Sequence, residues 1–200
     1  MDLFDYAVDF HKGIKRKGPG NDEQSKKALD HIPELPDTAK IMDIGRATGT
    51  QTIFLVNNTK AHITSIDIVP VFLEELKKKV RENQLSKRVT VRLQSMDKLD
   101  YTDNTFDLFW SENSIHHIGF SRGLREWYRY IKPGGYIVVS DLSWLTEKRP
   151  KELESYWYSI AKGIDTIENK IAVMQELGYE LLGHFILPDE CWLDDYYQEM

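Results

Sequence analysis

Residues 41–52 read Ile-Met-Asp-Ile-Gly-Arg-Ala-Thr-Gly-Thr-Gln-Thr, and this stretch decides the fold. An apolar run enters a turn of small residues, and a helical pattern follows. Gly45 lets the backbone turn with a positive φ, and small residues at 47 and 49 keep the loop thin. Backbone N–H groups of such a loop, together with the amino end of the next helix, suit a nucleotide-like ligand. A dinucleotide fingerprint would require glycine at 45, 47 and 50, so the spacing here favours a different ligand.

The next predicted strand ends in an acid at a spacing that suits a ribose. Asp67 follows Gly45 by 22 positions and closes the apolar run at residues 62–67. A carboxylate at this strand end accepts hydrogen bonds from both hydroxyls of a vicinal diol. The alternative role is the N-cap of the helix that begins soon afterwards. We favour the ribose because the loop and the spacing agree.

Short apolar runs and helical stretches alternate from residue 39 onward. Strands are predicted at residues 40–44, 62–67, 89–93, 106–111 and 136–141, and helices at residues 50–57, 71–83 and 124–131. The strands are apolar throughout, as expected when helices cover both faces of a parallel sheet. The alternation therefore predicts an α/β fold, a Rossmann-like doubly wound and mostly parallel sheet with helices on both faces.

The flanking segments complete a single predicted domain over residues 1–200. Helices are expected at residues 2–15 and at 21–31, the second capped by Asn21, and residues 1–37 are interpreted as a helical lid. Residues 38–200 form the predicted core, with a helical insertion near 148–177 that contains helices at 148–158 and 166–177. The apolar run at residues 180–187 predicts a sixth strand.

Composition excludes several classes of protein. The 200 residues include one cysteine, Cys191, and carry a net charge of −6. A single thiol cannot form an internal disulfide, which favours the cytoplasm. The acidic N-terminus lacks an apolar signal core, and no apolar run is long enough to span a membrane. The only basic stretch, residues 12–18, is short, which argues against a nucleic-acid substrate.

With loop, acid and spacing in place, the chain resembles class I S-adenosylmethionine (SAM)-dependent methyltransferases, and within them the small-molecule group that includes ubiquinone/menaquinone-biosynthesis C-methyltransferases. The likeness covers nearly all of the chain. Residues 94–99 (Gln-Ser-Met-Asp-Lys-Leu) resemble the turn beside the adenine, and residues 104–112 resemble the fourth strand that ends beside the methionine part of SAM. Residues 130–136 (Tyr-Ile-Lys-Pro-Gly-Gly-Tyr) resemble the turn into the fifth strand.

The resemblance implies SAM as the cofactor, a small-molecule acceptor and no metal. It implies cofactor contacts from Arg16, Asp43, Gly45, Arg46, Gly49, Gln51, Thr52, Asp67, Ile68, Ser95, Met96, Asp97 and Ser111. Arg46 departs from the family loop, which usually has a small residue or cysteine there. The guanidinium could clamp the cofactor carboxylate or obstruct the sulfonium, and we favour the clamp. Ser95 stands where many relatives carry an acid.

Methyl transfer from a sulfonium is an in-line displacement, so the enzyme mainly aligns donor and acceptor and excludes water. A base helps where the acceptor must lose a proton, and the candidates are Glu112, His116 and His117. For the two histidines we favour the other role, that of a polar pair on a surface turn. Aromatic residues at 110, 144, 157 and 158 are candidates for an acceptor pocket, although core packing is the default for Trp110.

Two other functions remain open. A SAM-binding but inactive module is suggested by Arg46, by Ala47 and by the short C-terminal part. An NAD-dependent oxidoreductase is disfavoured by the glycine spacing. The family sheet has seven strands, whereas six are predicted here and the seventh is missing. We expect the open edge to be closed by residues 188–200, by a shift of the sixth strand or by a second copy in a homodimer.

Overall fold

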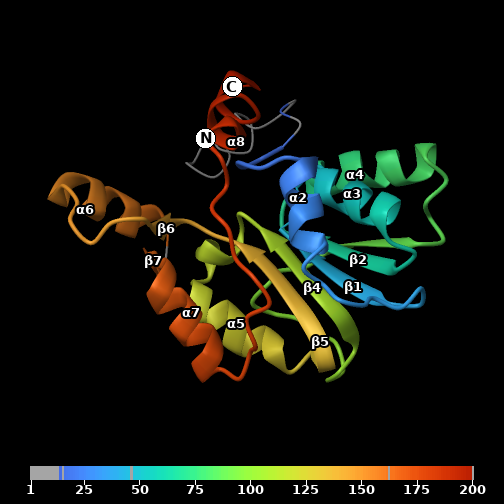
Figure 1. The fold of residues 1–200 in the computed structure, drawn as a ribbon. Helices are drawn as coiled ribbons and strands as arrows, with labels where there is room; N and C mark the ends of the chain where they lie inside the picture. The colour runs from blue at the N-terminus through green and yellow to red at the C-terminus, as the bar shows by residue number, and fades with distance from the viewer. Residues whose placement is uncertain (1–13, 15, 46, 162, 200) are drawn as a thin grey trace.

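The computed structural model describes residues 14, 16–45, 47–161 and 163–199. The predicted helix at 2–15 and the predicted cofactor contact Arg46 lie outside the described residues. A five-stranded sheet with the order β3-β2-β1-β4-β5 forms the centre of the molecule (Figure 1). Its strands are β1 (Lys40–Ile44), β2 (His62–Asp67), β3 (Val89–Leu93), β4 (Phe106–Glu112) and β5 (Ile131–Ser140).

All neighbouring strands in this sheet are parallel, which confirms the predicted doubly wound fold. Ile41 pairs with Ile63 of β2 and with Leu108 of β4. The chain reverses direction across the sheet between β3 and β4, so the carboxyl ends of β1 and β4 flank the switch point where such folds bind ligands. The first four strands lie where the sequence predicts them, and β4 is one residue longer.

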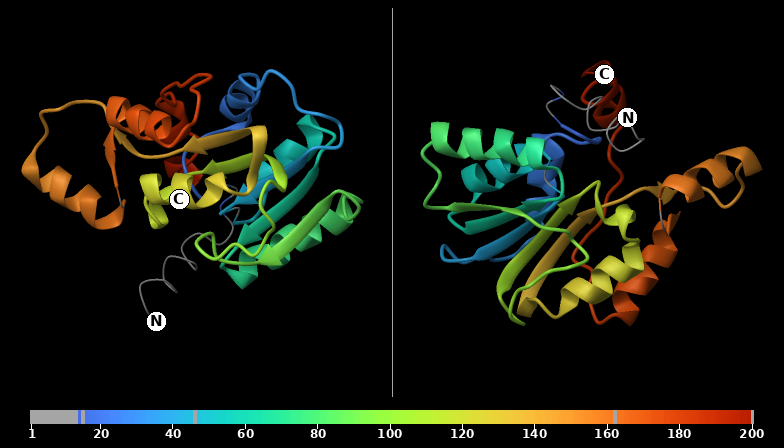
Figure 2. Two further views of the ribbon diagram at one scale, coloured as in Figure 1. Left: turned by 90° about the horizontal axis from the view of Figure 1, so that it is seen from below. Right: turned by 180° about the vertical axis from the view of Figure 1, so that it is seen from behind.

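Helices cover both faces, as the apolar strands require. The described helices are α2 (Asp22–Leu29), α3 (Thr50–Asn58), α4 (Pro70–Glu82), α5 (Phe120–Tyr128), α6 (Lys151–Ile160), α7 (Ile167–Glu176) and α8 (Glu190–Leu193), with short 3-10 turns at Ile115–His117 and Tyr197–Glu199. One core packs Trp110 and its neighbours against α3 and α4, and the other packs Phe109 against Trp127 of α5. α6 projects away from the rest of the molecule (Figure 1, Figure 2).

Local signals explain where these helices begin. The Asn21 side chain accepts a hydrogen bond from the Gln24 backbone N–H, which confirms the predicted N-cap of α2. Thr166 caps α7 in the same way through Asn169. Pro70 occupies the first turn of α4, where its missing N–H costs nothing.

The region around α5 and β5 differs from the prediction. α5 runs from Phe120 to Tyr128, rather than from 124 to 131. Glycine is needed at position 123 within this helix, because a Cβ there would collide with the Ile115 side chain. β5 begins at Ile131 rather than 136, since a register shift against β4 carries the strand past Pro133 and Gly134. A further parallel pair, β6 (Ser143–Trp144) and β7 (Asp165–Thr166), is too short for a sequence pattern to reveal.

The predicted sixth strand is wrong. Residues 180–187, here called the strap, form no strand and join no sheet. The strap runs from α7 towards α8 past β5 (Figure 1). A strand needs a hydrogen-bonded neighbour, and within the described residues β5 pairs with β4 alone.

In the described part of the chain, no helix is both long and apolar enough to cross a lipid bilayer.

Candidate functional site

The loop after β1 turns tightly against the end of β4. Gly45 has φ 69°, and its N–H donates to the Ile66 carbonyl at 3.0 Å. A Cβ on Gly45 would lie 2.4 Å from Cβ of Ser114. The Ser114 hydroxyl lies 3.1 Å from the Ile44 carbonyl and 2.8 Å from the Ser111 hydroxyl. Glycine is therefore required at 45, and Ser111 lies beneath the loop.

The second glycine of the loop is held from the opposite side. Gly49 has φ 82°, and a Cβ there would lie 2.3 Å from Leu76 of α4. Ala47 also has a positive φ, 43°, which is uncommon for a residue with a side chain. α3 begins at Thr50, so its amino end adjoins the loop. Gly45, Ala47 and Gly49 thus place little side-chain volume between the loop backbone and the carboxyl edge of the sheet.

Asp67 organises this loop from the end of β2. One carboxylate oxygen accepts the Ala47 N–H at 2.7 Å, and the other accepts the Val69 N–H at 2.9 Å. The second bond belongs to the turn that leads into α4, so the ribose and helix-start roles are compatible. Each oxygen retains a further lone pair, because a carboxylate has about four acceptor sites. The carboxylate therefore fits a diol without giving up the loop.

Three polar residues support the loop from below. Thr52 donates to Asp43 at 2.6 Å and lies 3.0 Å from the Ser65 hydroxyl. All three side chains are fully buried. The structure thus places Asp43 and Thr52 under the loop, where they fix β1 to α3 and to β2.

An apolar ledge lies beyond Asp67, at the ends of β2 and β3. Ile68 is 53% exposed and Leu93 is 63% exposed, which is unusual for side chains at the end of a buried strand. The Met96 carbonyl accepts the indole N–H of Trp127 at 2.9 Å, which fixes the turn. The Ser95 hydroxyl donates to Asp97 at 2.5 Å, and this bond lowers the pKa of the Asp97 carboxyl. A flat aromatic ring fits such a ledge.

Glu112 lies at the end of β4 within a dense polar network. Its carboxylate accepts hydrogen bonds from Arg16 at 2.8 Å, Ser25 at 2.9 Å and the indole of Trp110 at 2.8 Å, with the Gln51 amide 3.4 Å away. Arg16 is itself buried and reaches Asp22 at 2.9 Å. These four donors match the about four acceptor sites of a carboxylate, so the network fixes Glu112 in place at the end of β4.

The two histidines after β4 lie in different environments. Their rings stack with centroids 4.3 Å apart. His117 is exposed, whereas Nδ1 of His116 lies 3.5 Å from the carboxylate of Asp141 at the end of β5. Asp141 is paired with the buried Lys170 of α7. Neither Nδ1 of His116 nor the Asp141 oxygen nearest to it has a hydrogen-bond partner among the described residues, so the contact places His116, rather than His117, beside a carboxylate.

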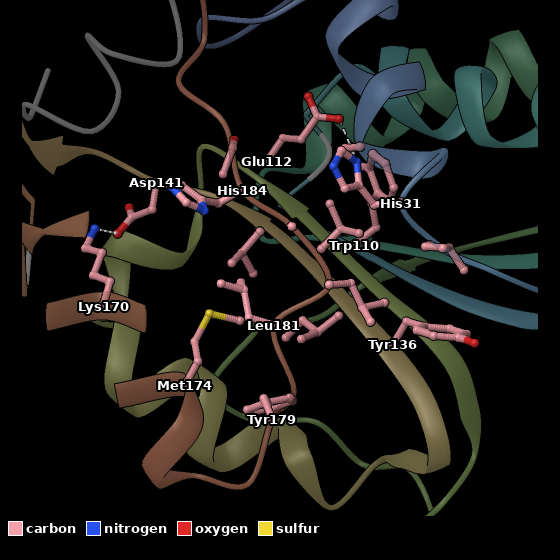
Figure 3. A pocket seen from close by; sticks show the side chains of 18 of the residues that line it. His31, Trp110, Glu112, Tyr136, Asp141, Lys170, Met174, Tyr179, Leu181 and His184 are labelled. Carbon is pink, nitrogen blue, oxygen red and sulfur yellow. Dashed lines mark hydrogen bonds and ion pairs between the residues drawn. The ribbon is translucent and has the colours of Figure 1, made fainter. Parts of the chain in front are cut away.

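A cavity of about 910 Å³ lies between β5, α2, α7 and the strap. Glu112 lies towards one end, and Asp141 and Lys170 lie towards another (Figure 3). Its walls include Trp110, Tyr136 and Leu181. Two of the other aromatic candidates, Trp144 of β6 and Tyr158 of α6, contact each other with ring centroids 6.3 Å apart.

Several residues of this region have no signal in the sequence. Asn113 donates to the Pro19 carbonyl at 2.7 Å, which ties residues 14–21 to the end of β4. Asn21 donates to Asp195 at 2.7 Å, and the Gly20 N–H donates to the Cys191 carbonyl at 3.4 Å. Asp141 and Lys170 are 29 positions apart. Such pairs are set by tertiary packing, since their members lie far apart in the sequence; the local motif that identifies Asn21 as an N-cap does not reveal its bond to Asp195. Among the described residues, no cluster of acids, histidines or cysteines could hold a metal ion.

Comparison with known proteins gives a consistent result. A family described as "Methyltransferase domain" matches residues 42–139. Methyltransferase GfsG of Streptomyces halstedii is 28% identical over 168 residues, which cover 80% of this chain and 60% of that protein. Ubiquinone/menaquinone biosynthesis C-methyltransferase UbiE of Geobacter sp. (strain M21) is 26% identical over 62% of this chain and 54% of its own. The crystal structure of the [4+2]-cyclase SpnF superposes with a TM-score of 0.68 at 25% identity, covering 81% of this chain and 59% of that one. The chain therefore spans less than two thirds of each of these proteins.

Proposed function

This chain carries a class I, SAM-dependent methyltransferase domain, and from that premise we propose that it transfers the methyl group of SAM to a small-molecule acceptor. The observation that carries the proposal is the joint geometry of the loop and Asp67. A thin loop with two positive-φ glycines meets a carboxylate that still has acceptor sites for a diol. Bound SAM would supply an activated methyl group on a sulfonium. The single buried cysteine supports a reducing compartment such as the cytoplasm.

Each part of the site has a proposed task. Asp67 accepts the ribose hydroxyls, and Ile68 with Met96 packs against the adenine, while Ser95 and Asp97 complete that turn. Gly45 and Gly49 let the backbone approach the methionine part, and Asp43, Thr52 and Ser111 hold the loop rigid. Gln51, Arg16 and Glu112 lie together at the methionine end, where Arg16 would attract the carboxylate and Glu112 would hold Arg16 in place.

Acceptor chemistry is proposed for the ends of β4 and β5. His116, beside Asp141, is placed to accept a proton where the acceptor must lose one, and His117 stacks against its ring. Residues 14–37 and the projecting α6, which exposes Leu153 and Tyr156, are proposed as the cover that excludes water. The acceptor is proposed only as a small molecule, since the relatives' names span different acceptors.

The test measures SAM binding and turnover separately, because the SpnF structure is named for a cyclase rather than a methyltransferase. Calorimetric titration with SAM should give saturable binding. Asp67→Ala should weaken it at least about tenfold, since each charge-assisted hydrogen bond contributes about 1.5–3 kcal/mol. Asp103→Asn is the matched control, because Asp103 lies on an exposed turn and bonds only Arg129 among the described residues.

Turnover is tested by following S-adenosylhomocysteine with mass spectrometry. The acceptor panel would carry an amine, a phenolic hydroxyl or an acidic carbon. Formation of S-adenosylhomocysteine with one class supports methyl transfer. SAM binding without turnover on all three would favour the binding-only function, and an Asp67→Ala variant with unchanged affinity would refute the assignment of the ribose.

A further inference from the structure

The large cavity runs along the outer edge of β5. Every residue from 131 to 143 lines its wall, and so does every residue from 178 to 187. Successive side chains of a strand point to opposite faces, so a cavity lined by consecutive residues must follow the backbone edge. This edge of β5 has no partner strand within the described residues. The cavity therefore separates two backbones, that of β5 and that of the strap.

The strap has the side-chain pattern of a strand without the hydrogen bonds of one. Leu181, Phe185 and Leu187 are half-buried, whereas the residues with even numbers from 180 to 186 are exposed. Within the described part of the chain, no backbone hydrogen bond involves residues 180–187. Side chains hold the strap instead, since the ring of Phe185 stacks on His31, just after α2, with centroids 6.1 Å apart, and the Lys27 ammonium of α2 lies 4.3 Å from the Phe185 ring centroid.

Two unpaired edges that face each other are costly, because backbone N–H and C=O groups facing an apolar cavity lose water without gaining a partner. One extended segment placed between them would pair with both. Neighbouring strands lie about 4.8 Å apart, so the inserted segment would convert the strap into a regular member of the sheet. Its length would match the eight residues of the strap.

We propose that the cavity takes the strap of a second copy of this chain. The resulting order is β5, the partner's strap, the strap, and β5 of the partner. One antiparallel pair of straps then fills both cavities, as a two-fold axis requires. The strap runs in the same direction as β5 (Figure 1). The partner's strap is consequently antiparallel to β5 and to the strap, so both new ladders are antiparallel.

The side chains of the strap are complementary to those of a second, antiparallel strap, and this selects the second copy and the register. With Leu182 on the two-fold axis, Glu180 stands opposite His184 of the partner subunit, and this pairing occurs twice. The same register places Leu182, which is 46% exposed, against its symmetry mate. Residues directly opposite in an antiparallel pair share a face, where the imidazole N–H of one residue can donate to the carboxylate of the other and apolar pairs add stability. A slip of one residue would turn every side chain to the wrong face.

The first experiment is sedimentation over about a hundredfold range of concentration, with dimerisation expected as concentration rises. Leu182→Asp places two carboxylates on the axis and should shift the dimerisation midpoint at least about tenfold upward. Its affinity for SAM should be unchanged, so failure of this proposal is distinct from failure of the proposed function. A strict monomer, or a dimer that Leu182→Asp does not affect, would overturn the proposal.

The second experiment does not depend on that variant. Leu182→Cys should form an intersubunit disulfide under mild oxidation, because the two side chains meet on the axis. Leu145→Cys is the matched control, since Leu145 is equally apolar and more exposed but lies outside the strap. Amide exchange in residues 180–187 should slow at least about tenfold at high concentration. Equal crosslinking of both cysteine variants, or a rate of amide exchange in residues 180–187 that does not change with protein concentration, would contradict the strap pairing.

Discussion

Two aspartates occupy similar places, Asp67 at the end of β2 and Asp141 directly after β5, and the two carboxylates have different partners. Asp67 is held by two backbone N–H groups of its own and the adjoining turn, and it remains available to a ligand. Asp141 is held by the Lys170 ammonium and faces His116, all side chains from separate elements. The β1–β2 side is therefore built from local backbone, whereas the β5 side depends on tertiary pairs.

The largest expected effect lies on the β5 side. Lys170→Met leaves the Asp141 carboxylate buried without its cation and should lower the free energy of unfolding by about 3–5 kcal/mol, as measured by urea denaturation. Lys170→Met combined with Asp141→Asn should recover much of the loss, because no charge is then left unpaired. Asp67→Asn should cost less, since its amide oxygen still accepts a backbone N–H. An equal loss in Asp67→Asn would break the contrast between the two regions.

The next effect lies on the β1 side and separates strain from steric conflict. Gly45 and Gly134 both have positive φ, 69° and 74°, but a Cβ meets Ser114 at the first and nothing within 4 Å at the second. Gly134→Ala should cost about 1–2 kcal/mol from backbone strain alone. Gly45→Ala should cost about 1–3 kcal/mol more because of overpacking, and SAM affinity should fall with it. If thermal denaturation showed equal losses of stability for the two variants, the Ser114 side chain would have to move away from the added Cβ without cost.

The smallest effect concerns protonation at the ledge. The Ser95 hydroxyl is the main cause that holds the pKa of Asp97 below its ordinary value, so Ser95→Ala should raise that pKa in an NMR titration. A carboxyl whose pKa is lowered in the folded state stabilises the fold at pH values above its unfolded-state pKa. This contribution is lost as the pH falls through the folded-state pKa. The difference in the free energy of unfolding between the wild type and Ser95→Ala should therefore shrink below about pH 4. Asp100 is the internal control: its pKa is lowered by Gln94 and Arg92 rather than by Ser95, so Ser95→Ala should leave it unchanged.

The contrast also explains which parts of the structure could be predicted. The bounds of β1, β2 and β3, the loop at Gly45 and the cap at Asn21 follow from residues adjacent in sequence, and all are confirmed. The prediction of a strand at residues 180–187 is wrong because the apolar run there has no neighbouring strand to pair with among the described residues. The network of Glu112 with Arg16 joins residues 96 positions apart, so no local pattern reveals its hydrogen bonds. Cofactor roles for the predicted residues stay predictions.

The contact between Asn21 and Asp195 has a consequence for biosynthesis. It joins residues 174 positions apart, beside the bond between Gly20 and Cys191. The ribosome must release residue 195 before this contact can form, whereas the β1–β2 unit is complete more than a hundred residues earlier. Closing so long a loop is also entropically demanding. A nascent chain would therefore hold a finished cofactor loop while its cover is still open, and ligand present during translation could bind before the cover closes.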